Sequence, residues 1–507
     1  MARFPAHLRQ ALIAFALAQF ICSFAGSNMN VMITDISKDL GTTVQGVQLA
    51  ITLFLLVMAA LMIPGGKLTD LLGRKWCLVA GLILFGSGAL ISSFAQGLPM
   101  LIIGYSVLEG VGTALLIPPV YILTTLLFTG VAARARAFGL ISAMGGVGAV
   151  AGPLIGGFVA SAIDWRAAFI LQSLICLVIV LLSRRAVRDP LPADRSMPFD
   201  VGGAVLSALG LILIVNGILL ADDNVLAMLG LLVAGALVLT WFFVSVRAKE
   251  RAGREPLLSL ELFRNRTSNL GLITQNTQWL MVMGTSFVVS TYLQVVKGFN
   301  AIETGAVFTA TTVGVLLSSL SAERMAQRRP QRTLVMGGFL ITIAGIALLL
   351  VAGGTAARVW GMLPGLFVIG LGLGAMLTPS VNIVQSAFRE DLQGEISGLS
   401  RSVSNLGSSL GAALTGTILV AGVSGAAPGR AYVWAMVAVA GAGVIGLVAA
   451  YFLPRDVPAR PEGAQPETPE PTASQPTASQ PTGSQSSGSE SSGSQPSGSQ
   501  SEEPRLA

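Results

Sequence analysis

Long apolar stretches fill most of the chain, and short polar segments separate them. Fourteen of these stretches have roughly 18–25 residues, the length that an α-helix needs to cross about 30 Å of hydrocarbon. The pattern predicts an all-α polytopic membrane protein with 14 transmembrane helices. The stretches cover about residues 10–33, 47–65, 77–96, 99–120, 138–160, 167–186, 201–221, 226–246, 269–293, 304–321, 333–353, 359–380, 397–422 and 431–453.

Composition supports a membrane protein. Hydrophobic residues make up 53% of the 507 residues and charged residues only 11%, whereas soluble proteins carry about 25% charged residues. The first apolar stretch is longer than a signal-peptide core and lacks an Ala-x-Ala site, so we expect it to remain as the first helix. Cys22, Cys77 and Cys176 lie in or beside apolar stretches without metal-binding spacing, and we interpret them as packing residues.

The distribution of positive charge predicts the orientation. If both termini are cytosolic and the loops alternate, all but five of the 31 Lys and Arg residues fall on the cytosolic side, with Arg401 counted among them. This bias satisfies the positive-inside rule and explains the net charge of +6 without a nucleic-acid partner. We expect a multi-pass protein of the cytoplasmic (inner) membrane with both termini in the cytosol. The five exceptions are Lys38, Arg166, Lys297, Arg358 and Arg430.

An internal repeat relates two parts of the chain. Segments 139–159 and 398–418 align with four glycines in register, and Gly112, Pro119 and Phe128 upstream match a second set in the same order. Two membrane-embedded repeats around a central site are typical of secondary transporters. The matched pairs are Gly139 with Gly398, Gly148 with Gly407, Gly152 with Gly411, Gly157 with Gly416, Gly112 with Gly372, Pro119 with Pro379 and Phe128 with Phe388.

The repeat suggests the domain organisation. We expect an N-terminal six-helix half at 1–190 and a C-terminal six-helix half at 268–453. Two additional helices with cytosolic loops occupy 191–267. Residues 454–507 are rich in Ser, Gln, Pro and Gly without an apolar pattern, and they predict a disordered cytosolic tail.

The loop after the second predicted helix carries the charged motif GGKLTDLLGRK at 65–75. We expect Gly66 to allow a tight turn at the membrane edge, and Asp70 to lie at a helix start among cations and to latch neighbouring helices. The motif resembles the signature of the major facilitator superfamily, which implies two six-helix halves and a gating loop that locks the outward-facing state. The residues that match are Gly66, Leu68, Asp70, Gly73, Arg74 and Lys75.

The fifth predicted helix contains GAVAGPLIGG at 148–157. Small residues four apart let helices approach closely, and a proline permits a kink. The string resembles the antiporter motif of drug:proton exporters, and Asp164-Trp165-Arg166 resembles their short outer loop. With fourteen helices, residues 8–453 resemble the fourteen-helix drug:proton antiporter branch, the multidrug efflux transporters. The motif residues are Gly148, Gly152, Pro153, Gly156 and Gly157.

Two ionisable positions of that branch are missing here. Its fourth helix usually has R-x-x-Q-G-x-G, but Ser106 and Glu109 replace the arginine and the glutamine, and Ala25 stands where the first helix has an aspartate. Glu109 lies deep in a predicted helix, where burial favours the neutral acid. We interpret Glu109 as the proton-coupling residue, with Ser106 as its hydrogen-bond partner one turn away and Asp35 as a second candidate. A structural glutamate at a helix contact is the alternative.

Sparse polar side chains in the helices indicate the kind of substrate. They accompany many Met and Phe residues, 16 and 22 in all, and a mostly apolar cavity with few polar groups suits hydrophobic or amphipathic compounds. The candidate substrate-binding residues are Asn28, Asn30, Gln275, Gln278, Trp279, Asn382 and Gln385.

The favoured function is a proton-coupled exporter of such compounds that works by alternating access as a monomer in the lipid bilayer. An antiporter dedicated to one endogenous metabolite or lipid is the alternative. The motifs around Asp70 and Pro153 disfavour a receptor that transports nothing. An enzyme is not expected, because the single histidine is His7 and no G-x-x-x-x-G-K-[ST] phosphate loop occurs. No metal or other cofactor is expected, with the proton gradient as the energy source.

Overall fold

The computed structural model of the protein describes residues 5–128, 131–187, 189, 199–220, 224–254, 256–326, 329–355, 359–388, 393–423 and 428–454. All regular structure in these ranges is helical, and thirteen helices within them are long and apolar enough to cross a membrane. This confirms the all-α polytopic fold. The predicted tail lies outside the described residues, apart from Pro454.

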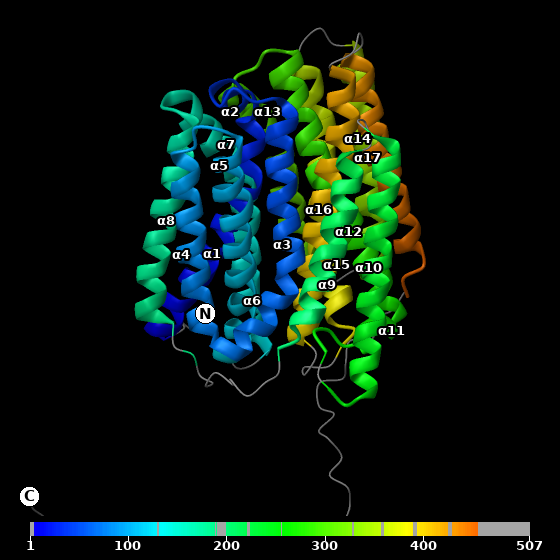
Figure 1. The fold of residues 1–507 in the computed structure, drawn as a ribbon. Helices are drawn as coiled ribbons and strands as arrows, with labels where there is room; N and C mark the ends of the chain where they lie inside the picture. The colour runs from blue at the N-terminus through cyan, green and yellow to red at the C-terminus, as the bar shows by residue number, and fades with distance from the viewer. Residues whose placement is uncertain are drawn as a thin grey trace, which may run out of the picture. The chain divides into compact units, whose positions relative to one another are not determined.

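The long helices follow the order of the predicted stretches and extend beyond most of them (Figure 1). They are α1 (Ala6–Asn28), α3 (Val44–Leu72), α4 (Arg74–Ser93), α6 (Gly110–Leu127), α7 (Val131–Ala162), α8 (Trp165–Ala186), α9 (Val201–Leu219), α10 (Val225–Arg251), α12 (Arg266–Thr291), α13 (Ala301–Ala326), α14 (Gln331–Thr355), α15 (Met362–Gln385), α16 (Gln393–Val423) and α17 (Pro428–Tyr451). Short helical segments are η1 (Met29–Val31), α2 (Ile33–Asp39), α5 (Leu98–Leu101), η2 (Ile102–Glu109), α11 (Glu261–Arg264), η3 (Tyr292–Val296) and η4 (Val359–Gly361).

The fourteenth predicted stretch, 397–422, lies in α16, which has 31 residues but is not among the thirteen apolar helices. Its polar side chains bond to neighbouring helices. The Ser402 hydroxyl donates to the Ala59 carbonyl oxygen of α3 at 2.5 Å, and the Ser400 hydroxyl donates to Gln275 Oε1 of α12 at 2.7 Å. A helix with polar contacts of this kind belongs in the interior of a bundle. The count of 14 spanning helices stays a prediction.

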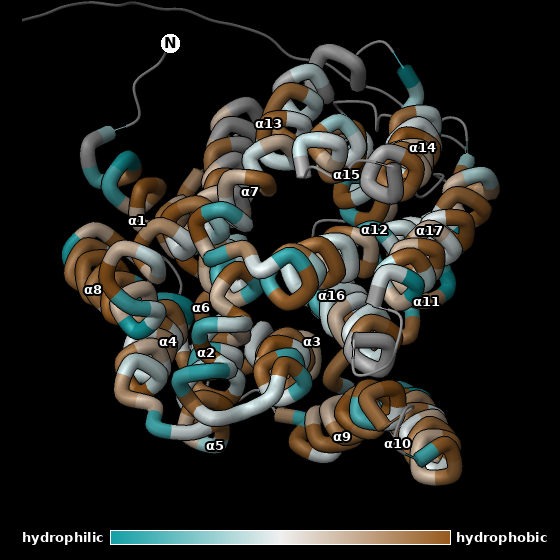
Figure 2. The backbone as a smooth tube through the Cα atoms, turned by 90° about the horizontal axis from the view of Figure 1, so that it is seen from above, coloured by the Kyte–Doolittle hydropathy of each residue, from teal (hydrophilic) through white to brown (hydrophobic). Residues whose placement is uncertain are grey.

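The helices form two similar halves (Figure 2). In the first half α1 packs against α7, and α4 packs against α6 and α8. In the second half α12 packs against α16, and α14 packs against α15 and α17. Between the halves, α7 contacts α13 and α16 contacts α3. Pairing α1 with α12, α3 with α13 and α7 with α16 relates the two halves, as expected from the sequence repeat.

Glycines aligned by the repeat have equivalent neighbours. Gly148 of α7 lies against the backbone of Phe20 in α1, and Gly407 of α16 lies against the backbone of Asn276 in α12. A Cβ atom at either glycine would overlap a carbonyl oxygen of the facing helix. Both positions therefore need glycine for the same reason, the close approach of two helices.

Helices α9 and α10 lie outside the two halves (Figures 1 and 2). α9 packs against α3 and α16, and α10 packs against α9. Large hydrophobic side chains of α10 are exposed, among them Leu226, Leu237 and Trp241, as expected for a helix that faces lipid. This is where two helices inserted between the halves can lie without disturbing their packing. The domain boundaries at 190 and 267 stay predictions.

Candidate functional site

The spanning segment that contains Glu109 departs from a regular α-helix. Residues Ile102–Glu109 form a π-helix between α5 and α6, and such segments occur frequently at functional sites. A Cβ atom on Gly104 would lie 2.8 Å from the carbonyl oxygen of Gly88 in α4. The close contact between these two backbones accompanies the wide turn, and Glu109 lies where that turn ends.

Glu109 is completely buried, and neither of its carboxylate oxygens has a hydrogen-bond partner among the described residues. Tyr105 and Thr113, four residues before and after it, share its face. The Tyr105 hydroxyl donates to the Ala25 carbonyl oxygen of α1 at 3.4 Å. The Thr113 hydroxyl donates to the Glu109 carbonyl oxygen at 2.8 Å and lies 3.9 Å from the Cys22 sulfur of α1. This face therefore points toward α1 inside the first half.

The predicted hydrogen bond between Ser106 and Glu109 is wrong. The Ser106 hydroxyl instead donates to the Ala50 carbonyl oxygen of α3 at 2.7 Å. Because a π-helical turn is wider than an α-helical turn, residues three apart no longer share one face as closely as in an α-helix. The structure therefore separates these two candidates, and no described residue partners the Glu109 carboxyl group.

The loop motif turns at Gly73 and not at Gly66, which corrects the prediction. α3 continues through Gly66 to Leu72, because glycine is well tolerated inside membrane helices. Gly73 has a φ of +96°, a value that residues with a side chain rarely adopt. Asp70 lies in the last turn of α3 and not at a helix start. Its side chain lies outside what the structure describes.

An acidic side chain does cap a helix at this motif, but it is Asp189, which follows α8. Its Oδ2 accepts from the backbone N–H groups of Arg74 and Lys75, at 2.8 and 3.3 Å. The Lys75 ammonium also donates to the Arg184 carbonyl oxygen at 3.0 Å. The start of α4 is therefore fixed to the end of α8, and a carboxylate faces the positive end of the α4 dipole.

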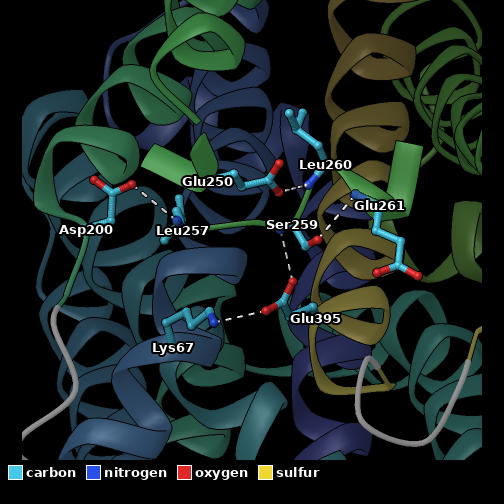
Figure 3. A network of polar contacts seen from close by, with 8 residues as sticks. All are labelled: Lys67, Asp200, Glu250, Leu257, Ser259, Leu260, Glu261 and Glu395. Atoms are coloured by element: carbon cyan, nitrogen blue, oxygen red, sulfur yellow. Dashed lines mark hydrogen bonds and ion pairs between the residues drawn. The ribbon is translucent and has the colours of Figure 1, made fainter. Parts of the chain in front are cut away.

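Glu395 joins both halves at the predicted cytosolic end (Figure 3). Its Oε1 accepts from Lys67 Nζ of α3 at 3.0 Å, and its Oε2 accepts from the backbone N–H of Ser259 at 3.1 Å. Glu395 itself lies in the first turn of α16, and Ser259 lies between α10 and α11. The Glu395 carboxylate of the second half therefore contacts both the first half and the segment between α10 and α11.

Two further carboxylates hold the segment between α10 and α11 (Figure 3). Asp200, which caps the start of α9, accepts from Lys249 Nζ at 2.5 Å and from the Leu257 N–H at 3.2 Å. Glu250 accepts from the Leu260 N–H at 2.7 Å. Burial alone would raise the pKa of Asp200, but the hydrogen bonds from Lys249 and from two backbone amides lower it below its usual value.

The antiporter motif lies wholly within α7, as Gly148, Gly152, Pro153, Gly156 and Gly157. A Cβ atom on Gly156 would lie 2.9 Å from Asn28 Cβ in α1. A Cβ atom on Gly157 would lie 2.5 Å from the Ala301 carbonyl oxygen of α13. The motif therefore lets α7 touch its own half and the opposite half at nearly the same level.

Residues of the predicted outer loop connect helices within the first half. Arg166 forms an ion pair with Asp39 at 2.5 Å and donates to the Ala95 carbonyl oxygen at 2.9 Å. The Trp165 ring N–H donates to Asp39 at 3.2 Å. The second proton-coupling candidate, Asp35, lies nearby in the chain.

Asp35 belongs to the short helix α2, outside the spanning segments. Burial raises the pKa of its carboxyl group, the Lys38 ammonium opposes the rise, and the Asp164 carboxylate adds to it. Asp35 is therefore a titratable group at the predicted outer end, whereas Glu109 lies in the middle of its segment. The structure does not bring these two candidates together.

Two of the substrate-binding candidates lie together in the second half. Gln275 and Gln278 are buried on α12, and their side-chain oxygens accept from the hydroxyls of Ser400 at 2.7 Å and Ser380 at 2.8 Å. The amide nitrogens of both glutamines are buried without a partner among the described residues. The described part of the second half therefore offers two buried hydrogen-bond donors without an acceptor from that part.

The remaining candidates are dispersed. Asn28 is buried against α7, and its amide atoms have no partner among the described residues. The carbonyl oxygen of Asn30 in η1 accepts from Gln294 Nε2 in η3 at 2.8 Å, which ties the first half to the second near the predicted outer end. Asn382 is exposed in the last turn of α15, two residues from Ser380 and thus on another face. Trp279 and Gln385 are half-buried.

Arg401 was counted with the cytosolic loops, but it lies within a long helix and is half-buried. It lies about two turns into α16, where its guanidinium group donates to the Tyr121 hydroxyl of α6 and lies 4.8 Å from the ring centre. The Tyr121 hydroxyl donates to Gln19 Oε1 of α1 at 3.2 Å. The sequence contained the signal, because Arg401 falls inside a predicted spanning stretch, where a charge is a functional candidate.

Known proteins resemble this chain over most of its length. It is 29% identical over 412 residues to the puromycin resistance protein pur8 of Streptomyces alboniger, covering 80% of this chain and 81% of that one. It is 26% identical to the multidrug efflux pump LfrA of Mycolicibacterium smegmatis (83% and 82% covered). It is 25% identical to the riboflavin transporter RibZ of Clostridioides difficile (79% and 86% covered).

The fold also has solved counterparts. The crystal structure of the peptide transporter POT in complex with sulfate superimposes with a TM-score of 0.65 and 16% sequence identity, covering 88% of this chain and 94% of that one. This likeness concerns the fold alone. The family model described as the Major Facilitator Superfamily matches residues 15–196 and 195–412. The chain belongs to the Major Facilitator Superfamily.

Proposed function

We propose that the protein is a proton-coupled exporter of hydrophobic or amphipathic compounds. The observation that carries the proposal is the Glu109 carboxyl group, which is fully buried and has no partner among the described residues. Such a group is most stable as a neutral acid while it is sealed from water, and it can ionise when water reaches it. Alternating access between the halves would expose it to each side in turn and carry a proton inward.

Two further observations support export. The antiporter motif in α7 touches both halves near their outer end, where it can open or seal the passage as the halves move. The relatives include a puromycin resistance protein and a multidrug efflux pump. Their names support the efflux of drug-like compounds by this chain.

A transporter dedicated to one compound is the second candidate. It is favoured by the likeness to RibZ, which is named for riboflavin alone. Under this alternative a single physiological compound stimulates proton movement, and cationic dyes have no effect. The same reconstituted protein tests both candidates.

We also propose the orientation of the protein in the membrane and its energy source. Both termini lie in the cytosol of a cell bounded by this membrane, and the monomer is the working unit. The proton gradient supplies the energy, and neither a cofactor nor enzymatic chemistry takes part. The positive-inside bias of the loops supports this orientation.

The test uses purified full-length protein in liposomes with an imposed pH gradient. Ethidium movement and lumenal pH are followed together for the wild type and for Glu109→Gln. We expect the wild type to couple dye movement to proton flux, and the variant to lose that coupling while still binding ethidium. Ser106→Ala is the matched control, because its hydroxyl bonds to Ala50 and not to Glu109.

The outcomes separate the alternatives. If the wild type moves no dye, the multidrug function fails and single metabolites and lipids must be tried in its place. If Glu109→Gln retains full coupling, Glu109 is structural, and Asp35 is the next residue to exchange. Loss of coupling in Ser106→Ala as well would show that the assay reports helix packing.

A further inference from the structure

We infer that Arg401, Tyr121 and Asn405 form an anion-binding part of the substrate site. The preferred substrates are then amphipathic compounds that carry a carboxylate or a comparable acidic oxygen. The inference rests on the proposed export function and narrows its substrate class. It concerns the boundary between α6 of the first half and α16 of the second.

The first observation is a cation, Arg401, that has no counter-ion among the described residues. Ion pairs among the described residues involve Lys67, Arg74, Arg166 and Lys249, and none involves Arg401. The hydrogen-bond partner of Arg401 in the described residues is the neutral Tyr121 hydroxyl. A charge inside a membrane segment usually pairs with another charge or marks a substrate path. Because no carboxylate of the described residues pairs with Arg401, we assign that role to a bound anion.

The second observation is the orientation of the guanidinium group. A guanidinium has five N–H donors in a planar fork that fits a carboxylate in bidentate fashion. Tyr121 holds the group through one hydrogen bond and through its ring, 4.8 Å away. Gln19 holds Tyr121 in turn, because its Oε1 accepts a hydrogen bond from the Tyr121 hydroxyl. The fork is thereby positioned before any ligand arrives, and donors remain free for it.

The third observation is an independent donor on the same face. Asn405 lies four residues after Arg401 in α16, so the two side chains are neighbours on the helix surface. The amide nitrogen of Asn405 is buried and has no partner among the described residues. A buried N–H donor without an acceptor is destabilising, and the oxygen of an anionic ligand would satisfy it. The unmet groups at this place are donors, which favours acids over cationic compounds.

The inferred anion site lies at a distance from Glu109, the proposed proton site. Tyr121 and Glu109 lie in one spanning segment, twelve residues and therefore about 18 Å apart along the helix. Arg401 reaches Tyr121 from the other half. A movement of the halves would change the Arg401–Tyr121 contact and leave Glu109 inside the first half. Substrate release and proton release can then respond to one movement at two places.

The experiment measures equilibrium binding to the full-length protein in lipid nanodiscs, with empty nanodiscs subtracted. The probes are 1-pyrenebutyrate and 1-pyrenebutanol, which share one ring system and differ in the acid group. We expect the wild type to bind the acid about tenfold more tightly than the alcohol, as one charge-assisted hydrogen-bonded pair allows. Arg401→Gln removes this preference and leaves alcohol binding unchanged. Asn405→Leu weakens acid binding about threefold.

The exposed Arg247 of α10 supplies the control, because Arg247→Gln removes an equal charge far from this contact and keeps the preference. Equal affinity of the wild type for both probes overturns the inference, and so does an unchanged preference in a folded Arg401→Gln protein. If that variant does not fold, Arg401→Met replaces it, since methionine keeps an unbranched apolar stem but has neither the charge nor the fork. An unchanged preference there also overturns the inference.

The binding experiment and the export experiment can each fail without the other. Acid preference needs no pH gradient, so a wild type that prefers the acid but moves no compound refutes the export function and keeps the anion site. A wild type that exports ethidium and shows no acid preference refutes the anion site and keeps the export function.

Discussion

Lys67 and Glu395 form an ion pair between the two halves, with Nζ and Oε1 3.0 Å apart. The side chains are 31% and 23% exposed, and an ion pair as exposed as this contributes only about 0.2–1 kcal/mol. Glu395 also accepts the Ser259 N–H, so the same carboxylate holds the inserted segment. An interaction of this size can break and form again during a transport cycle.

Glu395→Gln should therefore separate the predicted cytosolic ends of the halves more often. We expect a shift of about two- to fivefold in the ratio of open to closed conformations, because about 1 kcal/mol changes an equilibrium by that factor. Spin labels at the exposed positions Arg185 of α8 and Thr333 of α14 report the distance by electron–electron double resonance. The double variant Lys67→Glu/Glu395→Lys should restore the wild-type distribution. An identical distribution in the single variant would mean that this pair does not hold the halves together.

Gly73 and Gly66 provide a matched pair in one motif. Gly73→Ala should lower the free energy of unfolding by about 1–3 kcal/mol, because an alanine at φ +96° is strained. Gly66→Ala should be neutral or stabilising by up to about 1 kcal/mol, since Gly66 is helical and a Cβ there meets only Pro118 at 3.8 Å. Thermal unfolding in detergent measures both. If Gly66→Ala is the less stable of the two variants, the turn lies at Gly66 and not at Gly73.

The sequence alone was sufficient for the class of fold, because apolar length and charge distribution depend on the bilayer and not on tertiary contacts. The repeat also predicted which glycines are equivalent, since helices that approach closely need small residues wherever they cross. For α16 the apolar pattern is insufficient. Its serines and Arg401 lower its hydropathy, and only the neighbouring α3, α6 and α12 explain why such a helix lies inside the bundle.

Side-chain partners were harder to predict than helices. Ser106 was expected to bond Glu109 because residues three apart share a face in an α-helix, but the local π-helix changed that relation. Asp189 and Glu395 were not predicted at all. Both act on residues far away in the chain, so that only the fold reveals them.

Glu109→Leu should stabilise the protein while it abolishes proton coupling. The carboxyl group is buried and has no partner in the part of the chain that the structure describes, and removing an unsatisfied buried polar group is expected to stabilise the protein by about 1–3 kcal/mol. Thermal unfolding of the purified protein measures the change. Glu261→Leu is the control, because Glu261 is exposed and surface changes usually stay within about 0.5 kcal/mol. A lower unfolding temperature for Glu109→Leu would show that the carboxyl group is satisfied in the native state.

The start of α9 should loosen in acid. The pKa of Asp200 is lowered in the folded protein by Lys249 and by two backbone amides, although burial opposes this. The interactions of the ionised Asp200 carboxylate therefore stabilise the fold fully at a pH well above about 3.9, the pKa of an aspartate in the unfolded chain. This stabilisation is lost as the pH falls through the lower pKa that Asp200 has in the folded protein. Hydrogen exchange of the Gly203 amide, corrected for the intrinsic rate, should rise in this range. Asp200→Asn should remove the pH dependence, and a pH-dependent rise that persists in it would assign the effect to another group.

Gly157→Ala should damage the contact between the halves at their predicted outer end. The added methyl group would lie 2.5 Å from the Ala301 carbonyl oxygen of α13, which is too close for α7 and α13 to keep their positions. Gly146→Ala in the same helix is the control, because nothing lies within 4 Å of a Cβ there. In liposomes without substrate we expect a faster passive decay of a pH gradient for Gly157→Ala and a wild-type rate for Gly146→Ala. Since the contact joins the halves, an unchanged decay rate would separate the antiporter motif from the outer seal and confine its role to packing.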